Sequence, residues 1–231
     1  MFAIARLTGA RLHLQHVSTA AGIELVRRAK AEGLPVTCEV TPHHLAFTDE
    51  WVAGSRALLW EEDGARATPY DAATKVNPPL RTAADARALW AALGDGTVDA
   101  IATDHAPHAS VRKDVEYAEA AFGISGLETA LALLLAGVEA GLADLGAIVR
   151  ALSGGPARVL GMPVPASDAV LVDPAREWRV AAETLVSKGK NTPLLGRTLR
   201  GRVVLALVDG EVRYRDEATL GRARAQAAAR R

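Results

Sequence analysis

Strand-like and helix-like segments alternate along the first two thirds of the chain, and this alternation limits the fold more than any other feature of the sequence. Apolar, strand-like segments occupy residues 11–17, 34–40 and 98–103, and each is followed by polar residues. Such alternation is typical of a parallel sheet covered by helices. We therefore expect an α/β fold with at least three parallel strands.

Helix-capping signals support this alternation. Ser18 or Thr19 can cap a helix that ends near Gly33, and Thr82, with Asp85 three residues on, can begin a second helix that runs to about residue 93. Further helical patterns cover residues 127–140 and 145–152. The long segment between these strands and helices, residues 51–73, is expected to be a surface loop or lid.

The pattern changes from about residue 164. Short strand-like segments at residues 169–172, 178–180, 203–208 and 212–214 are separated by Pro, Asp and Gly, and Asp209-Gly210 is a hairpin turn signal. We predict a barrel-like segment over residues 1–160 and a small β subdomain over residues 161–231. The Ala/Arg-rich end, residues 222–231, is expected to form a helical tail at the surface. Three parallel strands cannot close a barrel, so further strands must come from a missing segment or a partner.

Charge and cysteine content exclude several classes of function. The 27 Lys and Arg residues balance the 27 Asp and Glu residues, so the net charge favours neither nucleic acid nor an anionic membrane. Cys38 is the only cysteine, which rules out an internal disulfide or a thiolate zinc site, and we expect it to be inert in a strand. No apolar run approaches the ~20 residues of a membrane span, and the first residues do not resemble a signal peptide. We expect a cytoplasmic protein.

Histidines and one aspartate gather at the ends of the three expected strands. Five of the six histidines lie in three short motifs there: His16, the pair His43-His44, and His105 with His108; Asp104 directly precedes His105. In α/β barrels this end of the strands carries the chemistry, and imidazole with carboxylate suits a hydrolytic zinc site. A single histidine of this kind is more often structural, and Asp104 alone is equally explained as a cap of the following turn.

Two other segments can bind an anionic ligand. Asn77-Pro-Pro-Leu-Arg81 is rigid and holds an amide and a guanidinium in fixed directions, although a surface arginine after a turn explains Arg81 as well. Phe122-Gly-Ile-Ser-Gly126 precedes a helix, and free N–H groups at a helix start attract anions. Glycine-rich helix starts are common, so this segment is a weak signal by itself.

Taken in order, these segments resemble the class I dihydroorotases of the amidohydrolase superfamily over nearly the whole chain. The matching motifs are Gln15-His-Val-Ser-Thr19, Thr41-Pro-His-His-Leu45, Lys75-Val-Asn-Pro-Pro-Leu-Arg81, Thr103-Asp-His-Ala-Pro-His108, Phe122-Gly-Ile-Ser-Gly-Leu-Glu-Thr129 and Ser187-Lys-Gly-Lys-Asn-Thr-Pro193. The third, fourth and fifth of these separate dihydroorotases from the related allantoinases and hydantoinases.

The resemblance implies the last three strands of a (β/α)8 metal-dependent barrel, a small β subdomain and two zinc ions. It implies interconversion of N-carbamoyl-L-aspartate and L-dihydroorotate in pyrimidine biosynthesis. By motif, His16 resembles a ligand of the second metal, and Asp104 resembles a ligand of the first metal and the acid/base. Asn77, His108 and the backbone at Phe122 and Gly123 resemble substrate contacts. His43, His44 and His105 are then supporting residues.

The chain also departs from the family pattern. The His-x-His pair, the bridging Lys or Asp and the further His of the family's N-terminal half have no counterpart in this sequence. Each metal would keep one protein ligand, fewer than the three or four that zinc takes. We therefore expect the chain to be inactive alone.

Three functional interpretations follow, and the sequence leaves them open. The chain is part of an active dihydroorotase completed by an N-terminal half or a second copy, or it is a non-catalytic scaffold for aspartate transcarbamoylase. The third interpretation is another cyclic-amide hydrolase, similar to allantoinases or hydantoinases. Because an opened barrel leaves unpaired strand edges, we also expect the isolated chain to aggregate or to need a partner.

Overall fold

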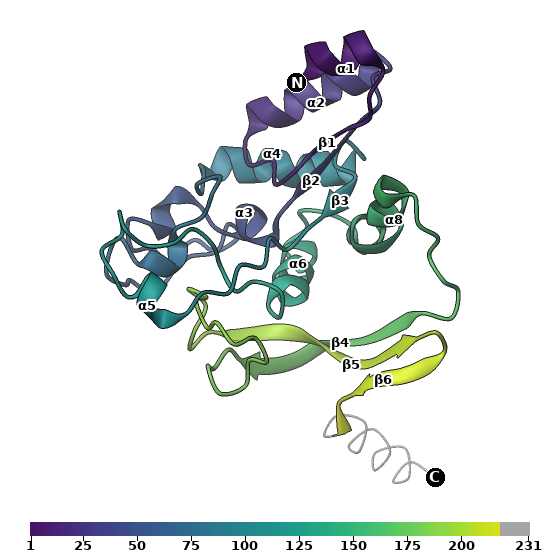
Figure 1. Ribbon diagram of the computed structural model, residues 1–231. Helices are drawn as coiled ribbons and strands as arrows, with labels where there is room; N and C mark the ends of the chain where they lie inside the picture. Colours follow the sequence, from purple (N-terminus) through teal and green to yellow (C-terminus); the bar gives the residue numbers. More distant parts are fainter. Residues whose placement is uncertain (218–231) are drawn as a thin grey trace.

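The computed structural model describes residues 1–217 and has two three-stranded sheets, with strand orders β1-β2-β3 and β4-β5-β6 (Figure 1). The first sheet is parallel and the second is antiparallel. The strands are β1 (Leu12–Leu14), β2 (Val36–Val40), β3 (Ala100–Ile101), β4 (Ala169–Arg179), β5 (Thr198–Val208) and β6 (Glu211–Arg215). The expected α/β class is confirmed, but the parallel sheet is open and is not a closed barrel in this part of the chain.

Helices connect and cover the strands. The α-helices are α1 (Phe2–Thr8), α2 (Ala20–Ala31), α3 (Pro42–Ala46), α4 (Ala83–Gly94), α5 (Ser110–Lys113), α6 (Ala130–Glu139), α7 (Leu145–Val149) and α8 (Gly155–Leu160). Shorter turns are the 3₁₀ helices η1 (Asp49–Trp51) and η2 (Ala72–Thr74) and the π-helical η3 (Arg150–Gly154). No helix within residues 1–217 has the length and apolar character needed to cross a membrane. The expected tail at residues 222–231 lies outside the described residues.

The two expected capping residues begin their helices. Thr19 accepts a hydrogen bond from the Gly22 N–H at the start of α2, and Thr82 accepts one from the Asp85 N–H at the start of α4. Asp85 also accepts a hydrogen bond from the Ala20 N–H, so the starts of α2 and α4 are joined. The caps therefore fix the two helices against each other as well as individually.

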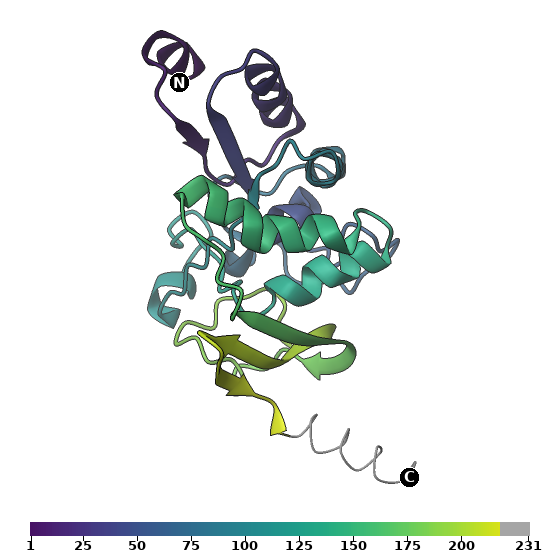
Figure 2. The same ribbon diagram turned by 90° about the vertical axis from the view of Figure 1, so that its right-hand side faces the viewer.

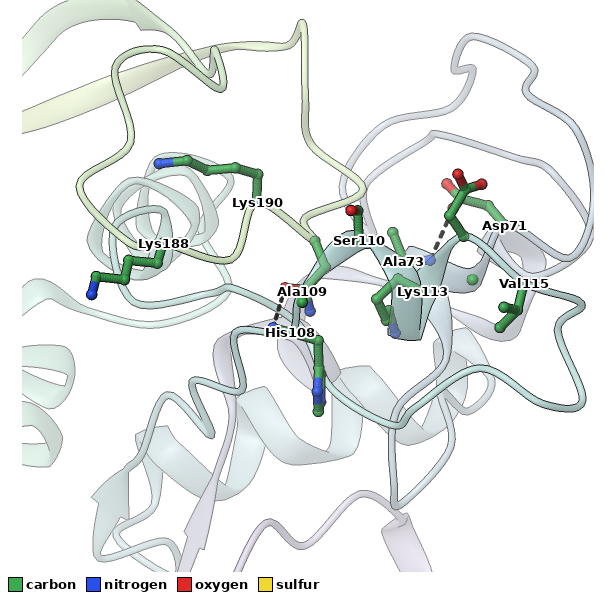
Figure 3. A pocket seen from close by; sticks show the side chains of 12 residues that line it. Asp71, Ala73, His108, Ala109, Ser110, Lys113, Val115, Lys188 and Lys190 are labelled. Carbon is green, nitrogen blue, oxygen red and sulfur yellow. Dashed lines mark hydrogen bonds between the residues drawn. The ribbon is translucent and has the colours of Figure 1, made fainter.

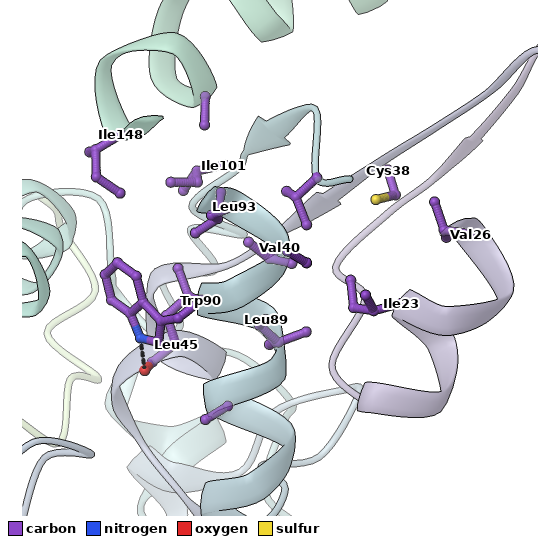
Figure 4. Close-up of a cluster of buried hydrophobic side chains, with 14 of the residues drawn as sticks. Ile23, Val26, Cys38, Val40, Leu45, Leu89, Trp90, Leu93, Ile101 and Ile148 are labelled. Carbon is purple, nitrogen blue, oxygen red and sulfur yellow. Dashed lines mark hydrogen bonds between the residues drawn. The ribbon is translucent and has the colours of Figure 1, made fainter. Parts of the chain in front are cut away.

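One face of the parallel sheet packs into an apolar core against α2 and α4 (Figure 4). Val36, Cys38 and Val40 alternate along β2 and are buried. The indole N–H of Trp90, on α4, donates to the Leu45 carbonyl at 2.9 Å and so keeps its polar atom satisfied within the core. Burial raises the pKa of the Cys38 thiol to about 12, which agrees with the expected inert role.

The other face of the parallel sheet is polar. His13 on β1 pairs in register with Thr37 on β2, and its Nδ1 lies 2.8 Å from the Thr37 hydroxyl. Its Nε2 lies 3.1 Å from a carboxylate oxygen of Glu39, two residues along β2. These three side chains are only partly buried.

The antiparallel sheet differs from expectation at β4. The segments 169–172 and 178–180 were expected as separate strands, but residues 169–179 form one strand along β5. Register shifts between Leu171 and Val172 and between Asp173 and Glu177 let the strand pass Pro174. The expected Asp209-Gly210 turn joins β5 to β6, where Val208 pairs with Glu211. Helix α6 lies against this sheet, on the side that faces the rest of the chain (Figure 2).

The stretch at residues 51–73 is anchored rather than loose. The Trp51 ring is fully buried and stacks on Phe47 with centroids 4.2 Å apart. The Arg56 guanidinium donates to the Asp71 carboxylate at 2.7 Å, and Ser55 forms a bridge with Arg66. The middle of the stretch, residues 62–70, is exposed.

Candidate functional site

His16 and Asp104 occupy matching places at the ends of two strands. His16 follows β1 and Asp104 follows β3, at the edge of the sheet expected to carry the chemistry. Both residues have left-handed backbones, with φ of 39° and 46°, which a residue other than glycine adopts at a cost of ~1–3 kcal/mol. His16 is partly buried and Asp104 is exposed. Strain of this kind is concentrated at functional sites, so the geometry agrees with the sequence motifs.

A buried histidine lies in the electrostatic range of both residues. Burial lowers the pKa of His44 to about 4. The His16 charge also lowers this pKa, whereas the hydrogen bond to the Pro78 carbonyl and the Asp104 charge raise it. Both predicted ligands therefore influence the pKa of the same imidazole. His44 is neutral near pH 7 as a consequence.

The hydrogen bonds of His44 give it a supporting role. Its Nδ1 lies 2.8 Å from the Thr41 hydroxyl at the start of α3, and its Nε2 lies 2.9 Å from the Pro78 carbonyl oxygen. The imidazole thus joins the end of β2 to the segment that begins at Asn77. Asn77 itself is exposed beside this anchor, at the same end of the sheet.

His43 is more deeply buried than its neighbour. Its ring lies 4.4 Å from the His44 ring, and burial holds the pKa of His43 well below its usual range. Its Nε2 is buried with no hydrogen-bond partner among the residues that the structure describes. The pair therefore adds two uncharged imidazoles beneath the strand ends.

His108 and the Phe122–Gly123 backbone are in direct contact. The His108 Nε2 lies 2.8 Å from the Phe122 carbonyl oxygen, and the Gly123 N–H donates to the Lys75 carbonyl at 2.8 Å. The Gly123 N–H, part of the backbone that resembles a substrate contact, therefore has an acceptor within the protein. Gly123 has φ of 133°, and a Cβ there would lie 2.4 Å from the Ala106 Cβ, so only glycine fits this approach.

His105 secures the entry to α6. Its Nδ1 accepts a hydrogen bond from the Leu127 N–H at 3.2 Å, and its Nε2 lies 3.3 Å from the Ser187 hydroxyl. Glu128 accepts further hydrogen bonds from the N–H groups of Val186 and Ser187. These contacts join the segment after β3 to the segment that precedes β5.

Sequence reasoning missed two residues near His108. Asn191 contacts the backbone of His108 and Gly123, and the Lys113 amine donates to the carbonyl groups of Ala121 and Gly123. Burial lowers the pKa of Lys113 to about 8. Asn191 stands in a recognised motif, which was a usable signal, whereas nothing in the sequence marks Lys113.

A cleft of about 620 Å³ lies beside His108 (Figure 3). Its lining includes His108, Lys113, Asp71, Lys188 and Lys190 but neither His16 nor Asp104. The amine of Lys190 is bound to the carbonyl groups of Leu185 and Ser187, and in Figure 3 the side chains of Lys188 and Lys190 point away from His108. The cleft is therefore adjacent to the strand-end site and separate from the two predicted metal ligands.

The donors present do not make a metal site by themselves. Within residues 1–217, no three side chains of His, Cys, Asp or Glu are grouped so that they could hold a metal ion. Zinc sites normally use three or four protein ligands. His16 and Asp104 supply two donors, so these residues do not fit a complete zinc site.

No protein-family profile matches the chain, but curated relatives do. A dihydroorotase of Anaeromyxobacter dehalogenans is 48% identical over 221 residues, which are 93% of this chain and 48% of that protein. A dihydroorotase of Geobacter sp. is 46% identical over 217 residues, covering 91% of this chain and 48% of that protein. The chain spans about half the length of the curated relatives that it matches.

Solved structures agree with this relationship. An L-hydantoinase (dihydropyrimidinase) from Arthrobacter aurescens is 28% identical with a TM-score of 0.77, over 93% of this chain and 47% of that one. An inactive dihydroorotase-like domain of a CAD-like multifunctional protein from Chaetomium thermophilum has a TM-score of 0.65 at 23% identity, over 91% of this chain and 53% of that one. The second likeness concerns the fold alone.

Proposed function

The chain is related to dihydroorotases over more than nine tenths of its length, and from this relationship we propose that it is the C-terminal part of such a cyclic-amide hydrolase. Residues 1–160 would supply the last three strands of a (β/α)8 barrel, and residues 161–231 a small β subdomain. The proposed reaction is the interconversion of N-carbamoyl-L-aspartate and L-dihydroorotate, a step of pyrimidine biosynthesis.

One observation carries this proposal: His16 and Asp104 both have strained backbones at strand ends and both act on the buried His44. The motifs that carry the resemblance place the same two residues among the metal ligands of the family. Tyr70 and Asp209 also have positive φ, so the strain at His16 and Asp104 supports the proposal through its place at the strand ends together with the motifs.

The proposed roles follow from exposure and chemistry. Opening a cyclic amide adds a water oxygen to the ring carbonyl, breaks the carbon–nitrogen bond and moves a proton from the water to the departing nitrogen. Asp104 is an exposed carboxylate, so it can accept that proton and deliver it. Asn77 and His108, with the backbone at Phe122 and Gly123, would bind the substrate.

The metal centre would be completed from outside the residues described. We propose that His16 and Asp104 each supply one ligand of a two-zinc site. Zinc takes three or four protein ligands, so these two residues are not enough. The remaining ligands would come from an N-terminal half or a second copy of the chain. On this proposal the chain alone is inactive.

The same lack of a three-donor group supports a second candidate, a non-catalytic scaffold with aspartate transcarbamoylase as partner. The likeness to solved structures named hydantoinases supports a third candidate, a hydrolase of other cyclic amides. Products separate this third candidate from the first, because L-dihydroorotate, hydantoin and allantoin open to different acids.

The test of this proposal is to measure zinc content and dihydroorotate turnover of the purified 231-residue chain. Both are measured on the chain alone and after its co-expression with the N-terminal half of the Anaeromyxobacter relative. Asp104→Asn is the test variant. Asp209→Asn is its matched control, because Asp209 is also an aspartate with a left-handed backbone, at φ 54°, in the β5–β6 turn.

Zinc binding and dihydroorotate turnover that appear only with the added half, and that Asp104→Asn abolishes while Asp209→Asn does not, would support the proposal. Two zincs and turnover in the chain alone would show that the ligand set is complete without a second half. No turnover in either preparation would favour the scaffold, and turnover of hydantoin alone would favour the third candidate.

A further inference from the structure

The Asn191 side chain is buried between three segments that are distant in the sequence. Its Oδ1 accepts a hydrogen bond from the His108 N–H at 2.8 Å and lies 2.9 Å from the Ser125 hydroxyl. Its Nδ2 donates to the carbonyl groups of Ala106 and Gly123, both at 3.0 Å. One amide thus joins its own segment, before β5, to the segment after β3 and to the segment before α6.

These partners fix the orientation of the amide. The carbonyl groups of Ala106 and Gly123 can only accept, so the Nδ2 must face them, and the His108 N–H can only donate, so the Oδ1 must face it. Both N–H groups and the oxygen of the side chain are therefore occupied. A buried polar group with all its partners made holds its surroundings in one arrangement.

The backbones around this amide are in close contact. A Cβ at Gly189 would lie 2.6 Å from the His108 nitrogen, and a Cβ at Gly123 would lie 2.4 Å from the Ala106 Cβ. The backbone of Asn191 adds a further link, because its carbonyl accepts from the Ser125 N–H at 3.1 Å. Small movements of the amide must therefore move His108 or Gly123.

We propose that Asn191 is a positioning residue that sets the arrangement of His108 relative to the Phe122–Gly123 backbone. Its side chain holds the backbone of His108 through one atom and that of Gly123 through the other. This inference rests on the proposed function, in which His108 and the Phe122–Gly123 backbone bind the substrate. Asn191 itself touches no substrate on this proposal.

Two substitutions separate the halves of the amide. Asn191→Asp keeps an oxygen for the His108 N–H but places a second oxygen against two carbonyl oxygens, and Asn191→Ala removes all four contacts. Thr192→Val is the matched control. Thr192 is buried in the same segment, and its hydroxyl accepts a hydrogen bond from the Leu194 N–H at 3.3 Å.

NMR on the full chain reports the contacts of the two ends of the Asn191 amide. Amide exchange reports the hydrogen bond to its oxygen, and carbonyl ¹³C shifts report the hydrogen bonds from its nitrogen. We expect the His108 amide to exchange roughly tenfold faster in Asn191→Ala than in Thr192→Val, since one buried hydrogen bond is lost. In Asn191→Asp the His108 amide should stay protected while the carbonyl shifts of Ala106 and Gly123 change. Such a split is not produced by a general loss of stability.

Turnover supplies the functional readout, on the active preparation. We expect KM for L-dihydroorotate to rise roughly tenfold in Asn191→Asp, with kcat close to that of Thr192→Val. The thermal midpoint of Asn191→Asp should fall, because the new oxygen faces the carbonyl oxygens of Ala106 and Gly123. Unchanged His108 exchange and carbonyl shifts in both Asn191 variants would overturn the inference, as would equal changes at all amides. If no preparation turns over dihydroorotate, the proposed function fails and the NMR results still decide the role of Asn191.

Discussion

His16 and Asp104, at the ends of the first and third parallel strands, share a left-handed backbone although neither is glycine. Their φ angles of 39° and 46° are retained at strand ends where glycine would relieve the strain. Each side chain also affects the pKa of the buried His44. The fold therefore places a histidine and a carboxylate at two strand ends of one sheet, at some cost in stability.

His16→Gly should cost less stability than glycine costs elsewhere in the same segment. Glycine relieves ~1 kcal/mol or more of left-handed strain at this position but loses ~0.4–1 kcal/mol through the greater freedom of the unfolded chain. Gln15→Gly is the control, because Gln15 is exposed and does not have a positive φ. The free energy of unfolding, measured in urea, should be ~1 kcal/mol higher for His16→Gly than for Gln15→Gly. Equal losses in the two variants would show that the His16 backbone is not strained.

The free energy of unfolding should fall as the pH is lowered below the unfolded pKa of His44. In this pH range His44 takes up a proton in the unfolded chain but not in the folded one. Burial lowers the folded pKa of His44 to about 4, whereas the unfolded value is ~6.5. The unfolded state therefore binds a proton first, so this contribution is fully present above pH ~6.5 and is lost towards pH 4 at up to ~1.4 kcal/mol per pH unit.

The variant His44→Gln isolates that contribution, because His43 remains in both proteins. The unfolding free energy, measured in urea at pH 7.5 and pH 5.5, should fall by ~1 kcal/mol more in the unsubstituted chain than in His44→Gln. Identical falls would mean that His44 is not held neutral by burial.

Two helical glycines should respond to alanine in opposite directions. A Cβ at Gly137 on α6 would lie 2.3 Å from two ring atoms of Trp90, whereas a Cβ at Gly94 on α4 meets nothing within 4 Å. We expect Gly137→Ala to destabilise by ~1–3 kcal/mol through overpacking. Gly94→Ala should stabilise by ~0.5–1 kcal/mol through helix propensity, and thermal unfolding of both variants measures the difference. A neutral Gly137→Ala would show that α6 can move away from α4.

The positions of the parallel strands were predicted from the sequence more accurately than their lengths. Residues 98–103 were expected as a strand, but only Ala100 and Ile101 pair with β2, and β1 pairs over three residues. A strand is defined by its partners, and both outer strands have a neighbour on one side only within the described chain. Similarly, Pro174 suggested a break that the register shifts of β4 absorb.

Position along the chain was enough to place His16 and Asp104 after the first and third strands of one parallel sheet. It was not enough to find the role of Asn191, whose amide binds backbone groups of residues 83 and 85 positions away. Backbone partners carry no side-chain signature, so contacts of this kind become visible only in the structure. The small helix α3 was missed for a related reason, since five residues give too little periodicity.

The outer side of β1 should mediate association of the isolated chain. Leu12 donates its N–H to the Pro35 carbonyl beside β2, so in a parallel ladder the N–H of the next residue, His13, points to the outer edge. The polar face around His13 and Glu39 is also only partly covered. Unpaired edges of this kind bind other strands, so sedimentation should detect oligomers or aggregates.

Proline at His13 tests this edge directly. His13→Pro removes the outward N–H and keeps the Leu12 hydrogen bond to β2, and proline is tolerated where an edge N–H faces outward. His13→Ala is the control, because it removes the same imidazole contacts to Thr37 and Glu39 but retains the N–H. We expect His13→Pro to be less associated than His13→Ala at equal concentration. If the unsubstituted chain is a soluble monomer with cooperative thermal unfolding, the β1 edge does not need a partner, and the open sheet is stable as it stands.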